Sequence, residues 1–127
     1  MQSLRGLNWN SGGFCDIAKH LFVKEAIREH KLDFVALLET GRSNFSIPFL
    51  NQLAGGYNFS WFCLPLRGRS GGILVGINSE MLQVLNVSTG DFCVKLHIIC
   101  KRDGFEWVQC LSMGLPKIFT SRNSSLN

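Results

Sequence analysis

The sequence predicts a mixed α/β fold, with two helices in the first half of the chain and a mostly antiparallel sheet after them. Three patterns support this prediction. Apolar residues recur with helical spacing at 16–30, five apolar residues stand together at 34–38, and apolar and polar residues alternate at 94–98. The chain has 127 residues, 46% hydrophobic and 17% charged, so we expect one domain with a packed core rather than a disordered chain.

Capping residues mark the ends of the predicted helices. In the helix at 16–30, Asp16 lies at the start, where a carboxylate complements the helix dipole. In the helix at 46–54, Ser46 can cap the first turn, a proline is tolerated there, and two glycines follow the last residue. Both helices are therefore expected to begin and end close to these positions.

Strands are predicted on both sides of the helices. Residues 1–8 read as a short first strand followed by a loop at 9–13, and residues 32–38 read as a strand buried on both faces. His97 falls on the polar side of an alternating strand and is expected to point outward. Further strands are expected at 59–64, 72–78, 82–87, 92–100 and 105–112, with tight turns at Gly90-Asp91 and Asp103-Gly104.

A single carboxylate, Glu39, follows the buried strand directly. Open α/β sheets bind ligands at the carboxyl edge of their strands. A buried strand also holds the side chain at its end in place, which a metal ligand requires. The competing interpretation is a solvated loop residue or a carboxylate at a helix start, and this pattern alone leaves both open.

Four segments occur in one order along the chain: LRGLN at 4–8, DFVALLETGRSNF at 33–45, LRGRSGGILVGIN at 66–78 and GDFCVKLHI at 90–98. Together they resemble the N-terminal half of an endonuclease/exonuclease/phosphatase domain of the DNase I-like superfamily. Within that superfamily, they are most similar to the endonuclease domain of plant LINE-type retrotransposons.

This resemblance implies a four-layer sandwich of two sheets flanked by helices, of which the chain would form a partial, truncated version. It also implies a division of the chain. Residues 1–114 are expected to be the N-terminal half of such a domain, and residues 115–127 an unrelated polar tail without strand alternation.

The resemblance assigns roles to individual residues. Members of the superfamily cut phosphodiester or phosphomonoester bonds with a divalent cation, usually Mg²⁺, and Glu39 matches the position that holds it. An asparagine two residues before an Arg-Gly pair helps to place the cation. Counting back from Arg5-Gly6 gives Ser3, a shorter and poorer ligand. Ser3 and Asn8 are the candidates for a second metal or substrate contact. In a working enzyme, Asn8, Asn10 or an unrecognised acid would replace the missing groups.

Later motifs of the superfamily, which supply the general base, have no match after Gly114, and the phosphate-contacting tyrosine of many relatives is replaced by Met113. His20 and His30 are expected to be ordinary helix residues. Because losing a general base alone slows a reaction about 10²–10⁴-fold, we expect little or no nuclease activity. The alternatives are a working magnesium-dependent nuclease or phosphatase, and a non-enzymatic module that binds nucleic acid or protein.

The charge of the chain suits contact with nucleic acid without requiring it. The net charge is +4, which is mildly basic. Arg67 and Arg69 flank a glycine in a predicted loop, where they would contact phosphates in the functional interpretation and be solvated turn charges in the more common structural one. If half of the sandwich is missing, an apolar sheet face would be open to water and could drive self-association.

The sequence also suggests a cellular location. It has no N-terminal signal peptide and no apolar run long enough to cross a membrane, so an intracellular location, in the nucleus or cytoplasm, is expected. No two of the five cysteines have the two-residue spacing of a zinc site, and reduced thiols are the simplest account of them.

Overall fold

The computed structural model describes residues 4–42, 44–64, 72–89, 94–111 and 117–120. In chain order the elements are β1 (Arg5–Asn10), α1 (Ile17–His30), β2 (Phe34–Leu38), α2 (Ile47–Ala54), β3 (Phe59–Leu64), β4 (Ile73–Asn78), β5 (Leu82–Thr89), β6 (Val94–Cys100), β7 (Glu106–Leu111) and β8 (Lys117–Thr120).

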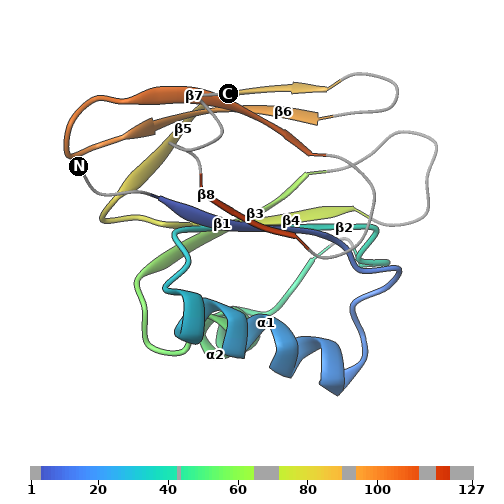
Figure 1. Cartoon of the computed structure of the whole chain (residues 1–127). Helices are drawn as coiled ribbons and strands as arrows, with labels where there is room; N and C mark the ends of the chain where they lie inside the picture. Colours follow the sequence, from blue (N-terminus) through green and yellow to red (C-terminus); the bar gives the residue numbers. More distant parts are fainter. Residues whose placement is uncertain (1–3, 43, 65–71, 90–93, 112–116, 121–127) are drawn as a thin grey trace.

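These elements form three layers (Figure 1). A sheet of five strands, in the order β3-β4-β2-β1-β8, lies in the middle, with α1 and α2 against one face. A second sheet of three strands, in the order β5-β6-β7, covers the other face. The predicted mixed α/β class, with two helices and mostly antiparallel pairing, is therefore confirmed.

The helices begin and end where their capping residues predict. The Asp16 side chain accepts a hydrogen bond from the backbone N–H of Ala18, and the Ser46 hydroxyl accepts one from the N–H of Phe49. α2 ends at Gly55, whose φ of 63° lies in the left-handed region that glycine adopts readily. Local capping chemistry thus sets both N-terminal boundaries and the end of the second helix.

The middle strand β2 is buried along its whole length, as predicted, because it lies between β1 and β4 and between two layers. It runs parallel to β1 and antiparallel to β4. Its side chains alternate between two cores, since Phe34, Ala36 and Leu38 face the small sheet while Val35 and Leu37 face the helices.

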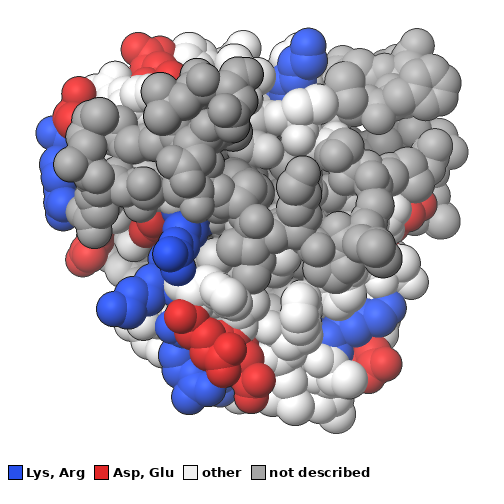
Figure 2. All heavy atoms as spheres, viewed as in Figure 1, with Lys and Arg blue, Asp and Glu red and all other residues white. Residues whose placement is uncertain are grey.

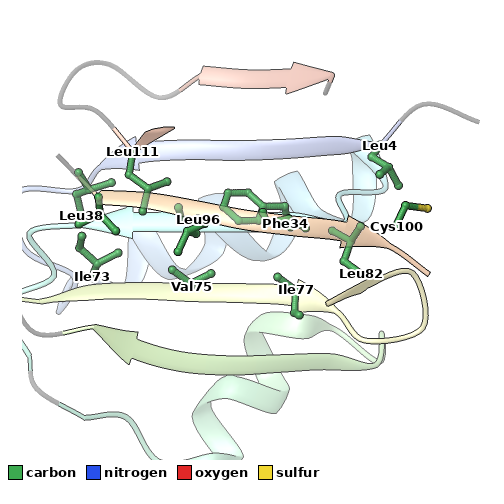
Figure 3. Close-up of a cluster of buried hydrophobic side chains, with 13 residues drawn as sticks. Leu4, Phe34, Leu38, Ile73, Val75, Ile77, Leu82, Leu96, Cys100 and Leu111 are labelled. Atoms are coloured by element: carbon green, nitrogen blue, oxygen red, sulfur yellow. The ribbon is translucent and has the colours of Figure 1, made fainter. Parts of the chain in front are cut away.

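The inter-sheet core joins the two sheets, and its side chains interleave between them (Figure 3). The large sheet and the residue before β1 contribute Leu4, Phe34, Ala36, Leu38, Ile73, Val75 and Ile77, and the small sheet contributes Leu82, Val94, Leu96, Ile98, Cys100 and Leu111. The helix-side core consists of Leu7, Phe14, Val23, Ala26, Ile27, Leu32, Val35, Leu37, Leu53 and Leu74.

Two expectations near the ends of the chain were wrong. Trp9 and Asn10, expected in a loop, belong to β1 because their pairing with Leu37 and Leu38 continues to the end of β2. Lys117–Thr120, expected in a strand-free tail, form β8, which pairs with β1 and satisfies the backbone groups on its second edge. The division of the chain at residue 114 stays a prediction.

The outer face of the small sheet is mixed rather than apolar. Lys95, His97 and Ile99 of β6 alternate with buried residues and point away from the large sheet, which confirms the outward position predicted for His97. His97 Nε2 lies 2.7 Å from Glu106 Oε1 on the neighbouring strand. Self-association through an exposed sheet face therefore remains a prediction, without a broad apolar surface at these positions to support it.

Asp33 lies just before β2, at the amino edge of the large sheet. Its carboxylate accepts hydrogen bonds from the backbone N–H of Arg5, at 3.4 Å, and from the Asn78 side chain, at 3.3 Å. Burial raises the pKa of Asp33 above its ordinary value of 3.8, and these two hydrogen bonds offset only part of the shift.

Stability is expected to fall as the pH rises through the window between the unfolded and the folded pKa of Asp33. In that window the native state binds more protons than the unfolded state, so raising the pH favours unfolding. Asp33→Asn removes this contribution. Urea unfolding of both proteins between pH 3 and 7 checks it, since wild type should lose stability relative to the variant as pH rises. Parallel pH profiles would contradict the assignment.

Candidate functional site

The carboxyl ends of β1 and β2 lie side by side because these strands are parallel and in register. Asn10, the last residue of β1, pairs with Leu38, the last residue of β2. Glu39 follows Leu38 directly. The fold therefore brings an amide side chain and a carboxylate to the same edge of the large sheet, the edge predicted to bind ligands.

The chain after β1 is tied to the chain after β2 by backbone hydrogen bonds. The N–H of Ser11 donates to the carbonyl oxygen of Leu38 at 2.9 Å, that of Gly13 to Glu39 at 2.6 Å, and that of Phe14 to Thr40 at 2.8 Å. Pairing of the two segments thus continues beyond the strands and limits movement at the edge.

Helix α1 ties down the same loop from the other side. Lys19 Nζ donates hydrogen bonds to the carbonyl oxygens of Ser11 and Gly13, at 2.6 and 2.9 Å. His20 Nε2 lies 3.0 Å from the carbonyl oxygen of Phe14. Lys19 and His20 therefore stabilise the conformation of the loop after β1.

The backbone at Glu39 is held in an unusual conformation. Its φ is 52°, in the left-handed region that non-glycine residues rarely adopt, and the side chain is half-buried. The next residue, Thr40, is fully buried, and its N–H donates to the carbonyl oxygen of Gly72 at 3.1 Å. Strained backbone held by its surroundings is common at functional sites.

Two asparagines on β1 supply amide oxygens close to this edge. Asn8 and Asn10 point to the same side of the strand, about 7 Å apart along it, and pair with Ala36 and Leu38 of the inter-sheet core. Asn10 Oδ1 accepts a hydrogen bond from the N–H of Gly12 at 3.2 Å. Asn8 Oδ1 is buried and has no hydrogen-bond partner among the described residues.

An unpartnered buried acceptor destabilises a protein by about 1–3 kcal/mol. A hydrated cation at the neighbouring edge would relieve this, because one of its waters could donate to Asn8 Oδ1. Carboxylate and amide oxygens suit Mg²⁺, which keeps several waters and needs few protein ligands. Glu39, Asn10 and Asn8 therefore fit a weakly held magnesium ion.

The described residues form no ready-made metal centre with several ionisable ligands. Within the described ranges, no group of three or more His, Cys, Asp or Glu side chains could hold a metal ion. The three histidines have other surroundings. His20 lies against the carbonyl oxygen of Phe14, His30 is the last residue of α1, and His97 lies against Glu106 on the outer face of the small sheet. In the part of the chain that the structure describes, no helix is long and apolar enough to cross a membrane.

Three predicted site residues, Ser3, Arg67 and Arg69, lie outside the described residues, as does Met113, which stands in place of the family's tyrosine. The Arg5-Gly6 pair that points to Ser3 lies at the start of β1, where Gly6 pairs with Phe34, at the edge opposite Glu39. Asn10, an alternative named in the sequence analysis, ends β1 at the edge that carries Glu39. Its place at this edge depends on pairing with the parallel strand β2, which the residues alone do not reveal.

One comparison with known proteins identifies a family. Residues 7–112 match the model of the Endonuclease/Exonuclease/phosphatase family. No match was found among curated proteins. The matched segment contains Asn8, Asn10 and Glu39 and extends through β7. The match covers most of the chain, which therefore belongs to the endonuclease/exonuclease/phosphatase family, whose members hydrolyse phosphate esters, generally with a divalent metal and generally on nucleic acids.

Proposed function

We propose that this polypeptide binds a hydrated Mg²⁺ ion weakly at Glu39 and Asn10 and that, by itself, it hydrolyses phosphate esters little or not at all. The observation that supports this most is the pairing of Asn10 with Leu38, which delivers the amide and the carboxylate to one sheet edge. A single carboxylate gives a cation only modest charge compensation, so its affinity is expected to be low.

The chain's own residues would divide the work at this edge. Glu39 supplies the negative charge, Asn10 a neutral oxygen, and the buried oxygen of Asn8 accepts a hydrogen bond from a water molecule. The hydrogen bonds of Ser11, Gly13 and Thr40 hold these side chains in place. When bound, the ion supplies Lewis-acid polarisation of a phosphoryl oxygen.

We infer low activity for these 127 residues because the superfamily's proton acceptor has no match among them. Hydrolysis of a phosphate ester needs a group that takes a proton from the attacking water. The superfamily's general base has no match after Gly114, and residues 115–127 contain no Asp, Glu or His. We expect a rate about 10²–10⁴-fold below that of a relative with its base.

We further propose that the chain derives from the endonuclease domain of a plant LINE-type retrotransposon. The order of the four resembling segments supports this origin. A working nuclease or phosphatase remains the main alternative, and a binding module for nucleic acid is the second, favoured by the net charge of +4. The contacts expected of Arg67 and Arg69 remain predictions.

Replacing Glu39 with glutamine is expected to abolish stabilisation by magnesium. At ten times the dissociation constant, an ion that binds only the native state stabilises it by about 1.4 kcal/mol. Thermal unfolding of each protein in MgCl₂ and in EDTA measures this difference. Glu25→Gln, on the exposed surface of α1, is the matched control and should keep the magnesium effect.

Plasmid nicking tests the second half of the proposal. Wild type should cut supercoiled DNA in MgCl₂ no faster than Glu39→Gln does. Magnesium-dependent nicking at the rate of complete family members, lost in the variant, would overturn the proposal and favour the working nuclease. Equal stabilisation of wild type and Glu39→Gln by magnesium would remove Glu39 from the metal site.

A further inference from the structure

We propose that Arg42, three residues after Glu39, binds a phosphate group and that its side chain is positioned for this by the rings of Phe45 and Phe49. The inference rests on the proposed function only in taking the edge that carries Glu39 as one that handles phosphates. The phosphate could belong to a nucleic-acid strand or to a small phosphate ester, and the experiment below distinguishes the two.

The backbone of Arg42 is fixed near Glu39. Its N–H donates a hydrogen bond to Thr40 Oγ1 at 3.4 Å, and Thr40 Oγ1 lies 3.2 Å from its carbonyl oxygen. Thr40 is fully buried and is itself tied to Gly72. Arg42 therefore starts from a rigid point three residues after the carboxylate.

The side chain of Arg42 rests on an aromatic platform, formed by Phe45 and Phe49. The guanidinium carbon lies 4.8 Å from the centroid of the Phe45 ring and 5.9 Å from that of Phe49. The two rings stack on each other, 5.7 Å apart and 14° from parallel. Phe14 and His20 pack edge-on against Phe49 from the protein side. The platform is thus anchored in the helix-side core.

This arrangement leaves the binding groups of Arg42 open. Stacking occupies one face of a guanidinium and leaves the N–H donors along its edge available. Arg42 is exposed, and among the described residues no acidic side chain forms an ion pair with it. A planar fork of donors matches the oxygens of a phosphate group. Because the platform already restrains the side chain, binding loses less side-chain entropy.

Basic and acidic side chains are mixed on the face of the molecule that Figure 2 shows. They are interspersed around the helix layer, without a broad basic patch among the coloured residues. A single arginine held in place would therefore contribute a distinct share of phosphate binding, which substitution can measure.

The test is binding of fluorescently labelled single-stranded and duplex DNA to the full chain, measured by anisotropy at low salt in EDTA. Arg42→Ala is expected to weaken binding about tenfold or more, as for loss of a charge-assisted hydrogen bond. The salt dependence should fall by about 0.7 (single strands) or 0.9 (duplex) in log–log slope. Arg28→Ala, an exposed arginine in the last turn of α1, is the charge-matched control and should change affinity less than twofold.

Variants of Phe45 test the positioning role. Phe45→Leu removes the ring and should weaken DNA binding as Arg42→Ala does, whereas Phe45→Tyr keeps the ring and should restore wild-type binding. Phe45→Leu should also add little to the effect of Arg42→Ala in the double variant, because both changes remove one contact. Additive losses would make Phe45 structural only and overturn its positioning role.

The outcomes are distinct. Competition by unlabelled DNA, but not by inorganic phosphate at the same phosphate concentration, identifies a nucleic-acid strand, and equal competition identifies a small phosphate ester. Equal affinities for Arg42→Ala and Arg28→Ala, or no binding of DNA by wild type, overturn the inference. If Arg42→Ala weakens DNA binding in EDTA but magnesium does not stabilise the wild-type protein, the magnesium proposal is wrong and the Arg42 inference stands.

Discussion

Replacing Phe14 with alanine is expected to lower the free energy of unfolding by about 3–5 kcal/mol, the range for a large buried ring. Phe14 is completely buried in the helix-side core. Its ring packs edge-on against His20, Phe45 and Phe49, with centroids 4.7 to 6.4 Å away. The cavity would open between the loop after β1 and both helices, where backbone hydrogen bonds already limit relaxation.

Urea unfolding measures this loss, and Phe22→Ala is the matched control. Phe22 is 42% exposed, although its ring touches Trp9, so its removal should destabilise the protein far less. Since domains are stable by only about 5–15 kcal/mol, the Phe14 variant should also unfold at a markedly lower temperature. Equal losses for the two variants would show that Phe14 is not a central core residue.

Replacing Leu96 with alanine is expected to cost about 2–5 kcal/mol. Leu96 is fully buried in β6, the middle strand of the small sheet, and its side chain faces the large sheet (Figure 3). Lys95→Ala, at the neighbouring outward position, is the control and should change stability little. A small effect at Leu96 would mean that the two sheets are held together elsewhere.

The Phe14 and Leu96 changes should add in a double variant. They lie in different cores, on opposite faces of the large sheet. Distant sites without shared partners usually add within about 0.3–0.5 kcal/mol. A larger coupling energy would indicate that β2, whose side chains enter both cores, transmits strain between the layers.

Much of the fold could be predicted because its signals are local. Asp16, Ser46 and Gly55 carry the chemistry of helix ends in their own side chains or backbone freedom. The uninterrupted apolar run of β2 is typical of a strand that is buried on both faces. These features depend on neighbours in the sequence, so the residues alone reveal them.

The parts that could not be predicted depend on distant partners. Trp9 and Asn10 look like loop residues, and they become strand because β2 offers the matching backbone groups. Lys117–Thr120 become strand for the same reason, beside residues more than a hundred positions earlier. Tertiary pairing overrides weak local preference in both cases.

The candidate site shows the same contrast. The place of Glu39 could be predicted from the buried strand before it, whereas its left-handed backbone could not. The contact of Arg42 with its aromatic platform depends on the path of the turn after β2 and on the orientation of α2. The sequence spacing of Arg42, Phe45 and Phe49 alone therefore does not predict it. Metal binding at this edge and the contacts of Arg67 and Arg69 stay predictions.

The pairing of β8 with β1 affects where the C-terminal boundary of a shorter expressed fragment should be placed. A version that stops at residue 112, where the family match ends, would lack Lys117–Thr120 and leave the outer margin of β1 bare. An exposed strand edge can pair with strands of other chains, which promotes aggregation. Poor behaviour of such a trimmed product would then reflect its boundary, and cloning should retain these four residues.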